Sequence, residues 1–452
     1  MKNNSVGTGM YYSGGLAELV ASPSRLTHSY FAGWFCGAGS LGFAMKRLGL
    51  FYSKLSVPVV DLFEDELYVN LISEELTLYQ GTIFSYKPQT DVHKTPQLKV
   101  DLVKLFNPLC LFHTLKILLI QSQWIAKPDA MVQKAQVLIG EIPEEPGSTL
   151  QEIDKVLQEK VWPGVLAVGI LSEFYNQLIL KEAKDKNTVI QAYISSKVFV
   201  RDWFFKSISD QKRVENGGMS FAEYIREYGT RADKDYELTF PRWHEMQDIL
   251  KKRIQEYSEP TYEKTAELSD VSPSLKKLIE TVITFQIMRS EAKKKALIHM
   301  DALRQAILSK TKSVQDIRNL SKQQIESGNV EQAVDVGKNQ ESSKTAQEFT
   351  LRSGKGICIS QGEVEGEVKN ILDNNAFIQK GTIGIFSNAS PEFAVQFPKC
   401  TGMIFLRGGQ TSHGAIVARE FGIPAVVDSS IKGIADGTKV RLNATEGEWI
   451  IL

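Results

Sequence analysis

Cysteine is scarce in this 452-residue sequence, which contains four cysteines and no CxxC pair. Cys36, Cys110, Cys358 and Cys400 lie far apart, and this spacing disfavours both a disulfide framework and a structural zinc ribbon. A net charge is also lacking, because 53 basic residues balance 53 acidic ones. The sequence therefore offers no global basic field for nucleic acid or an anionic membrane, and we expect binding only at a local site.

Long hydrophobic runs are missing as well. The most apolar stretches, Val161–Leu171 and Leu109–Ile120, are too short to cross a bilayer of about 30 Å, and His113 and Lys116 interrupt the second. The N-terminus shows no apolar stretch of the signal-peptide type. We therefore expect a cytoplasmic protein that has neither a membrane nor nucleic acid as a partner.

The length and composition are those of a globular chain. With 42% hydrophobic and 23% charged residues, the 452 residues allow two to four folded units. The pattern over residues 1–320 predicts a mainly α-helical domain with a few strands, and over 351–452 it changes to short β-rich runs punctuated by glycine. Residues 321–350 are polar and predict a flexible linker, with a surface helix that only connects as the alternative.

Several elements follow from local patterns. Ser272–Thr311 begins with Ser-Pro and carries apolar residues at helical spacing, which predicts one long helix. Leu62–Ile72 predicts a turn followed by a strand, and Thr82–Tyr86 predicts another strand. Near the C-terminus we expect strands and one short helix; the strands are Glu365–Ile371, Thr382–Ser387 and Gly402–Leu406, and the helix follows Ser390-Pro391.

The chemistry is concentrated in Arg407-Gly408-Gly409-Gln410-Thr411-Ser412-His413-Gly414, directly after the last of these strands. Paired glycines let the backbone turn tightly and approach a ligand. Thr411 or Ser412 can cap a following helix, which places His413 in the first helical turn. Unpaired backbone N–H groups and the positive end of the helix dipole favour an anion there.

A histidine in this position can act as a nucleophile. A neutral imidazole attacks a phosphorus atom, and neighbouring N–H groups can then donate to the oxygens of the phosphorylated ring. The positive helix end lowers the proton affinity of the imidazole, which keeps it available near neutral pH. For an isolated histidine, a capping or loop role would be the better interpretation, but the surrounding pattern favours phosphoryl transfer.

The segment Gly408–Val427 (GGQTSHGAIVAREFGIPAVV) resembles the phosphohistidine motif of the phosphoenolpyruvate-utilising enzymes, the family of pyruvate phosphate dikinase, phosphoenolpyruvate synthase and rifampin phosphotransferase. The resemblance runs from about Gly354 to the terminal hairpin near Gly447 and implies an α/β swivelling domain. It implies that His413 is phosphorylated and dephosphorylated in each turnover. Leu406 stands where the family has an acidic residue. The residues expected to support the phosphate loop are Arg407, Gly408, Gly409, Thr411, Ser412 and Gly414.

A weaker resemblance covers the helical region. Ser22–Thr27, Tyr228–Arg231 and Pro241-Arg242-Trp243 are similar to segments of the family's substrate domain, although Thr230 replaces a histidine and Ala232 replaces a glycine. This region and the long helix contain the residues that we expect to act on a substrate. These candidate substrate-domain residues are Arg231, Arg242, Arg289 and Glu291.

Each of these candidates has an alternative interpretation. The three arginines offer planar donors to a phosphoryl group, and structural ion pairing is the alternative for each. Glu291 can accept a proton from an acceptor hydroxyl if it is buried, and a solvated helix carboxylate is the alternative. The remaining histidines show no HExxH-type spacing, so we expect no metal site.

The resemblance also predicts what must come from elsewhere. The sequence shows neither the family's ATP-grasp domain nor its phosphoenolpyruvate-binding barrel, and no GxxxxGKS/T loop. We therefore expect a phosphotransferase component that needs a separate ATP-grasp protein, which binds ATP with Mg²⁺, and that passes the phosphoryl group from His413 to a small-molecule acceptor. The alternative is a non-catalytic phosphocarrier or regulatory protein controlled by phosphorylation of His413.

Overall fold

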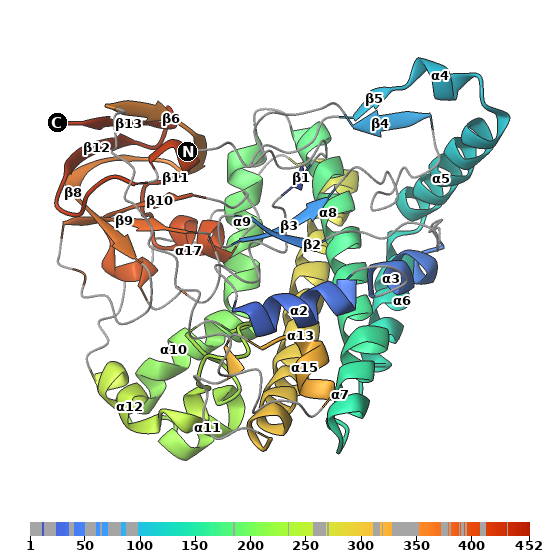
Figure 1. Ribbon diagram of the computed structural model, residues 1–452. Helices are drawn as coiled ribbons and strands as arrows, with labels where there is room; N and C mark the ends of the chain where they lie inside the picture. The colour runs from blue at the N-terminus through green and yellow to red at the C-terminus, as the bar shows by residue number, and fades with distance from the viewer. Residues whose placement is uncertain are drawn as a thin grey trace, which may run out of the picture. The chain divides into compact units, whose positions relative to one another are not determined.

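The computed structural model divides the chain into two compact units, which are described separately (Figure 1). The first contains Met1–Phe174, Tyr236–Thr239 and Glu291–Lys338, and the second contains Tyr175–Asp235, Phe240–Ser290 and Asn339–Leu452. The residues that the structure describes are 11–12, 24–35, 40–49, 60–63, 66–70, 83–86, 98–183, 186–233, 235–255, 268, 271–310, 317–318, 320–327, 352–371, 378, 381–387, 389, 393, 396–406, 413–431 and 433–452.

The first unit is built from helices with small antiparallel sheets. Its helices are α2 (Arg25–Phe35), α3 (Ser40–Arg47), α4 (Leu102–Leu105), α5 (Pro108–Ala126), α6 (Pro128–Gly140), α7 (Leu150–Val156), part of α8 (Trp162–Ala183), part of α13 (Pro273–Leu308) and α15 (Lys322–Glu326). Its strands are β1 (Tyr11–Tyr12), β2 (Val60–Phe63), β3 (Glu66–Asn70), β4 (Phe84–Tyr86) and β5 (Leu98–Val100). The strands predicted within Leu62–Ile72 and Thr82–Tyr86 are present as β3 and β4, whereas β2 was not expected.

Aromatic side chains from distant segments form the centre of this unit. The rings of Trp34 and Trp162 lie 5.7 Å apart, and Phe31 packs 5.3 Å from Trp34. Tyr236 adds a third segment of the chain, with its ring 6.0 Å from that of Trp162. All four side chains are fully or almost fully buried, so this cluster joins α2, α8 and the 236–239 segment into one core.

Residues 321–327, the start of the predicted linker, are a packed helix. Ser321 and Gln324 form a capping box at the start of α15, which explains why the helix begins there. Lys322 donates from its backbone to Ser29 Oγ at 2.7 Å and from its Nζ to Asp154 Oδ2 at 2.6 Å, and Ile325 is buried. The first residues of the predicted linker are therefore held by the first unit, and residues 328–351, which make up most of it, lie outside the described residues.

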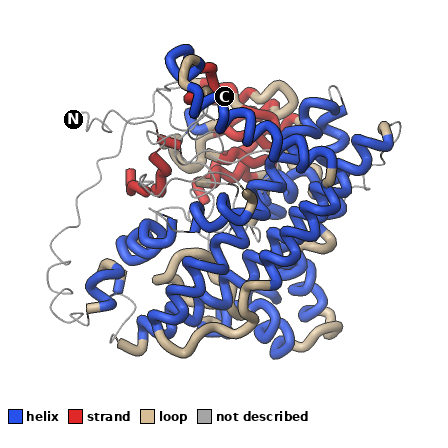
Figure 2. The backbone as a smooth tube through the Cα atoms, turned by 90° about the vertical axis from the view of Figure 1, so that its right-hand side faces the viewer, coloured by secondary structure: helices blue, strands red, loops and turns tan. Residues whose placement is uncertain are grey.

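The second unit combines helices with the C-terminal sheet. Its helices are part of α8, α9 (Asn187–Phe199), α10 (Trp203–Glu215), α11 (Phe221–Tyr228), α12 (Gln247–Gln255) and part of α13 (Pro273–Leu308). The long helix predicted over Ser272–Thr311 is therefore confirmed. Figure 2, with helices in blue and strands in red, shows how much of the described chain is helical.

The C-terminal sheet is mixed, with parallel strands at its centre and antiparallel strands on both sides of them. Its order is β6-β13-β12-β8-β9-β10-β11-β7, in which β8, β9, β10 and β11 are parallel neighbours. The strands are β6 (Ser353–Lys355), β7 (Ile357–Ser360), β8 (Glu363–Ile371), β9 (Thr382–Phe386), β10 (Gly402–Phe405), β11 (Ala425–Val427), β12 (Lys439–Asn443) and β13 (Glu448–Ile451).

Burial follows the position of each strand in this sheet. The central strands β9 and β10 are buried at every residue, whereas β12 alternates between exposed and buried positions. The three strands predicted from sequence are present as β8, β9 and β10. Most of the short helix predicted after Ser390-Pro391 lies outside the described residues.

Candidate functional site

The chain order of the C-terminal sheet determines where His413 lies. Helix α17 (His413–Glu420) connects β10 to its parallel neighbour β11, and His413 is the first residue of this helix. In parallel α/β sheets, ligands bind beyond the carboxyl ends of the strands, where the helix N-termini also lie. The backbone of His413 therefore starts a helix at the usual ligand-binding edge. Arg407–Ser412 lie outside the described residues, and so does the side chain of His413.

Gly414, the second residue of α17, is held by close packing. Its N–H donates to the carbonyl oxygen of Ala389 at 2.9 Å. A Cβ atom at this position would lie 2.8 Å from Phe405 Cζ and 2.9 Å from Ala389 Cβ. Gly414 thus lets the start of α17 approach the end of β10, and in this structure its N–H group already has an acceptor within the domain.

Leu406, which stands where the resemblance led us to expect an acidic residue, continues the hydrophobic core. Its side chain is half-buried and packs against the cluster that contains Ile385, Ile404 and Val426. Its N–H donates to the carbonyl oxygen of Phe386 at 2.8 Å, which extends the β9–β10 pairing by one residue. The aliphatic side chain therefore suits the surroundings of this position.

The far end of α17 is held by α9 within the same unit. Arg419 donates from Nε and Nη2 to Ser195 Oγ, at 3.1 and 2.9 Å, and from Nη1 to the carbonyl oxygen of Ile359 at 3.2 Å. The ring of Phe421 meets that of Phe199 edge-on at 5.7 Å. Burial raises the pKa of Glu420 to about 7, and the adjacent Arg419 charge partly opposes this shift.

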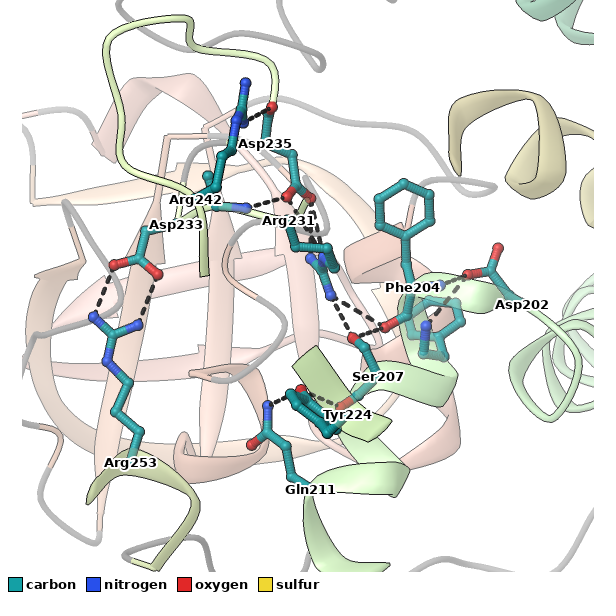
Figure 3. A network of polar contacts seen from close by, with 12 residues as sticks. Asp202, Phe204, Ser207, Gln211, Tyr224, Arg231, Asp233, Asp235, Arg242 and Arg253 are labelled. Atoms are coloured by element: carbon teal, nitrogen blue, oxygen red, sulfur yellow. Dashed lines mark hydrogen bonds and ion pairs between the residues drawn. The ribbon is translucent and has the colours of Figure 1, made fainter. Parts of the chain in front are cut away.

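The helical part of the second unit holds a network of buried arginines (Figure 3). Arg231 is 1% exposed and forms an ion pair with Asp235, in which Nη2 and Oδ2 lie 3.0 Å apart. Its Nη1 donates to Ser207 Oγ and to the carbonyl oxygen of Phe204. The guanidinium also lies 4.7 Å from the ring centroid of Trp243. The donors and both faces of this side chain are therefore largely engaged within the fold.

Arg242 is fully buried beside it. Its Nη1 donates to the backbone carbonyl of Asp235, and its N–H donates to Glu245 Oε2 at 2.8 Å. Ala232 forms an isolated β-bridge with Arg242 and donates from its N–H to Asp235 Oδ1 at 2.8 Å. The alternative of structural ion pairing thus agrees with the Arg231–Asp235 contact, whereas the guanidinium of Arg242 donates to a backbone carbonyl. Ala232 contacts both Arg242 and Asp235. Thr230 is half-buried.

The two candidates on α13 differ in exposure. Arg289 is half-buried, whereas Glu291 is exposed. The base interpretation of Glu291 requires burial, so its exposure agrees with the alternative of a solvated helix carboxylate.

Sequence analysis assigned no role to a carboxylate that joins Ser22–Thr27 to the turn at residues 236–239. Glu237 is 2% exposed, and its Oε1 accepts from Ser24 Oγ and Thr27 Oγ1, each at 2.7 Å. The N–H of Ser24 donates to Oε2 at 2.8 Å, and Thr239 donates to Oε1 from both its backbone and its hydroxyl. The segments share no motif that predicts this pairing across more than 200 residues. Because its oxygens are so heavily engaged, Glu237 acts as a structural acceptor.

A metal site needs several ligating side chains close together. In the part of the chain that the structure describes, no group of three or more histidine, cysteine, aspartate or glutamate side chains could hold a metal ion. The described residues therefore supply no ligand set for the Mg²⁺ that accompanies ATP.

The C-terminal part of the chain matches a known protein family, and shared segments relate the chain to curated proteins. Residues 378–447 match the family described as PEP-utilising enzyme, mobile domain. Rifampicin phosphotransferase of Bacillus subtilis (strain 168) is 37% identical over 95 residues, which cover 20% of this chain and 11% of that protein. Phosphoenolpyruvate synthase of Deinococcus radiodurans is 30% identical over 115 residues, which cover 23% of this chain and 15% of that protein. The matched segments thus span between 11% and 15% of these relatives.

Proposed function

We propose that this chain, whose residues 378–447 are a mobile domain of the phosphoenolpyruvate-utilising enzymes, is the histidine-bearing component of a phosphotransferase. In this proposal a separate ATP-grasp protein binds ATP and phosphorylates His413, and the phosphoryl group then passes to a small-molecule acceptor in the helical region. The observation that carries the proposal is that α17 begins at His413, beyond the carboxyl end of β10, within the segment that matches the family.

Two displacement steps make up the proposed reaction. In the first, a ring nitrogen of His413 attacks a phosphorus atom of ATP; an N–P bond forms, and the P–O bond to the departing nucleotide breaks with its electron pair on oxygen. In the second, an oxygen of the acceptor attacks the same phosphorus, the N–P bond breaks, and its electron pair returns to the ring. The acceptor proton passes to a base. Positioning and electrostatic stabilisation would provide most of the rate enhancement in both steps.

A second candidate function is a phosphocarrier that regulates a partner without transferring the group to a small molecule. The internal engagement of Arg231 and Arg242 favours it, because these side chains were the expected phosphoryl donors in the helical region. The presence of Thr230 where the family has a histidine favours it as well. Both candidates share phosphorylation of His413 and differ only in where the phosphoryl group goes next.

Labelling tests the shared step. The full chain is incubated with ATP-grasp proteins encoded beside its gene and with ATP labelled at the β- or γ-phosphorus, and acid-labile label on the chain is measured. We expect label on the wild type and on His244→Gln, whose half-buried histidine lies outside the C-terminal sheet, but not on His413→Gln. Absence of label on the wild type with every such protein would refute both candidates.

A chase separates the two candidates. The labelled chain is freed of nucleotide and mixed with small hydroxyl and carboxylate compounds that neighbouring enzymes produce. Loss of label to a small molecule supports the phosphotransferase. Retention of label, together with a change in the affinity of a partner protein on phosphorylation, supports the carrier instead.

A further inference from the structure

One surface of the first unit is apolar and exposed. It comprises α4 and the first turns of α5, here called the α4–α5 tip, which Figure 1 labels beside the β4–β5 hairpin. Val103 and Phe106 are 83% and 84% exposed, and Leu102, Leu109 and Leu115 are 67–70% exposed. Exposed apolar residues are common when scattered, but a contiguous patch of them marks an interaction surface. The other members of the tip are Phe112 at 62% and Leu119 at 60%.

The tip is exposed because α5 contacts the unit along a narrow stripe. Thr114, Ile117 and Trp124 are its buried residues, spaced so that they lie on one face. Trp124 meets the ring of Phe174 edge-on at 5.1 Å, and Thr114 Oγ1 accepts from the N–H of Ile83 at 3.0 Å. The remaining faces of the first turns are also apolar, and the described part of the unit leaves them uncovered.

Burial distinguishes α5 from a second apolar helical segment among the described residues. Pro108–Ala126 has a mean hydropathy of 1.3 but is only 17% buried, whereas the segment Leu150–Ala183, with 1.2, is 56% buried, as a core helix is. By length and composition alone both could cross a membrane, which corrects the expectation that Leu109–Ile120 and Val161–Leu171 are too short, because the helices extend beyond these stretches. Because Thr114, Ile117 and Trp124 pack against the protein, we treat α5 as a helix that lies along a surface.

Within the helices of the tip the charged side chains have one sign, and the nearest carboxylate is that of Asp101, which caps the start of α4. No aspartate or glutamate occurs between Asp101 and Asp129, while Lys116 and Lys127 are exposed. A helix with Leu and Phe on its apolar face and lysine beside it is typical of helices that lie in the interface of an anionic membrane. Juxtamembrane lysines gain free energy from the negative surface potential of such a membrane.

We propose that the α4–α5 tip is a docking surface for an anionic lipid membrane, in which its leucine and phenylalanine side chains enter the boundary between headgroups and acyl chains. The proposal replaces our expectation that the protein has no membrane partner, because a zero net charge conceals a local segment without acidic residues. It is independent of the phosphorylation of His413.

Two other occupants fit the tip less well. Pairing with a second copy of α5 about a two-fold axis near its middle would bring two exposed Lys116 side chains together, which is unfavourable. A protein groove is less favoured because the exposed residues of the tip include no Trp, Tyr or Arg, the residues that dominate protein–protein binding energy.

Vesicle sedimentation of the full chain tests the proposal. The probes are phosphatidylcholine vesicles with and without about 30% phosphatidylglycerol, a lipid that supplies the negative surface potential. We expect the wild type to sediment with the anionic vesicles and Phe112→Glu/Leu115→Glu to stay in solution. Val200→Glu/Ile249→Glu is the matched control, since those residues are 63% and 53% exposed in the second unit, and it should sediment like the wild type. Lys116→Gln should weaken binding by about fivefold at low salt.

Each alternative outcome would overturn the proposal. Equal binding to vesicles without phosphatidylglycerol would remove the electrostatic part of the argument. Loss of binding in the control variant as well would show that the tip is not the site. A wild-type dimer that Phe112→Glu/Leu115→Glu dissociates in light scattering, without vesicle binding by either protein, would assign the tip to a second copy. Far-UV circular dichroism of each variant verifies that it is folded.

Discussion

Gly414 and Ala389 are joined by a hydrogen bond of 2.9 Å that fixes the first turn of α17 against the segment following β9. This bond has a consequence for the phosphoryl chemistry, because the start of a helix normally offers several free N–H groups to an anion. One of them is already used within the domain. A phosphoryl group on His413 would therefore depend on other donors, and Arg407–Ser412 are the residues from which we expect them.

Replacing Gly414 by alanine tests this packing. The added Cβ would lie within 3 Å of Phe405 and Ala389, and overpacking of this kind costs about 2 kcal/mol of unfolding free energy. Gly140→Ala is the control, because a Cβ at that helical glycine meets nothing within 4 Å and alanine is the better helix former. Urea unfolding of the full chain measures both. A Gly414→Ala protein as stable as the wild type would contradict the close approach.

Arg231 is expected to contribute mainly to stability. Arg231→Met leaves Asp235 buried without its partner, and breaking such a pair costs about 3 kcal/mol or more. Arg213→Met, which removes the more exposed partner of Asp210, should cost less than about 1 kcal/mol. Arg231→Lys should recover only part of the loss, because lysine lacks the planar fork and the stacking surface. Unchanged stability of Arg231→Met combined with lost transfer of label from His413 would support the phosphoryl-binding role instead.

Glu237 is expected to be essential to the junction between its own segment and α2. In Glu237→Gln one oxygen becomes an NH₂ group that cannot accept from Ser24 or Thr27, and we expect a loss of about 2 kcal/mol. Glu280→Gln, an exposed change on α13, should stay within about 0.5 kcal/mol of the wild type. Chemical unfolding of the two variants side by side provides the measurement. Equal midpoints would show that the network is dispensable.

Glu420 should make stability depend on pH in a defined direction. Its pKa is raised to about 7 by burial, so the folded state holds its proton over a range in which the unfolded state has lost it. The unfolding free energy therefore falls as pH rises from the ordinary glutamate range to about 7, and it stays lower above that. Glu420→Gln removes this dependence. Between low pH and pH values above 7, the unfolding free energy of Glu420→Gln should therefore fall less than that of the wild type.

A carboxylate with the opposite shift serves as the control for this experiment. Hydrogen bonds from Ser148 and Thr149 lower the pKa of Glu152 in its capping box. Ionised Glu152 stabilises the folded protein at pH values above the ordinary glutamate pKa, and this stabilisation is lost as pH falls. Compared with the wild type, Glu152→Gln should therefore lose more stability at neutral pH than at low pH. Urea midpoints across the pH range would show the two variants departing from the wild type in opposite directions. Parallel curves for Glu420→Gln and the wild type would contradict the burial of Glu420.

Several features of the chain were predictable because they depend on neighbours in sequence. The alternation and glycine content of the C-terminal residues predicted β8, β9 and β10, and the Ser-Pro start with helical spacing predicted α13. The GGQTSHG pattern predicted a helix with His413 in its first turn, and α17 begins at that residue. Each of these depends on turn chemistry, capping or periodicity, which act over a few residues.

Other features depend on residues that meet only after folding. The segment 321–327 is polar enough to predict a linker, yet Lys322 is fixed to Asp154, which lies 168 positions earlier. In the same way, Arg231 offers the donors of a phosphate-binding residue in sequence, and its burial against Asp235 and Trp243 engages them internally.

The sequence alone specified the strands that precede His413, the place of His413 in the first turn of a helix and the length of α13, because local propensity and a compact motif specify these features. Tertiary structure decided which polar groups are free to bind a ligand. A guanidinium or carboxylate has the same donors or acceptors in any sequence, but burial and partner distance determine whether they are available, as Arg231 and Glu237 show. Tertiary structure also decided the exposure of the α4–α5 tip. Hydrophobic residues are expected to be buried, and only the packed fold shows which of them remain exposed.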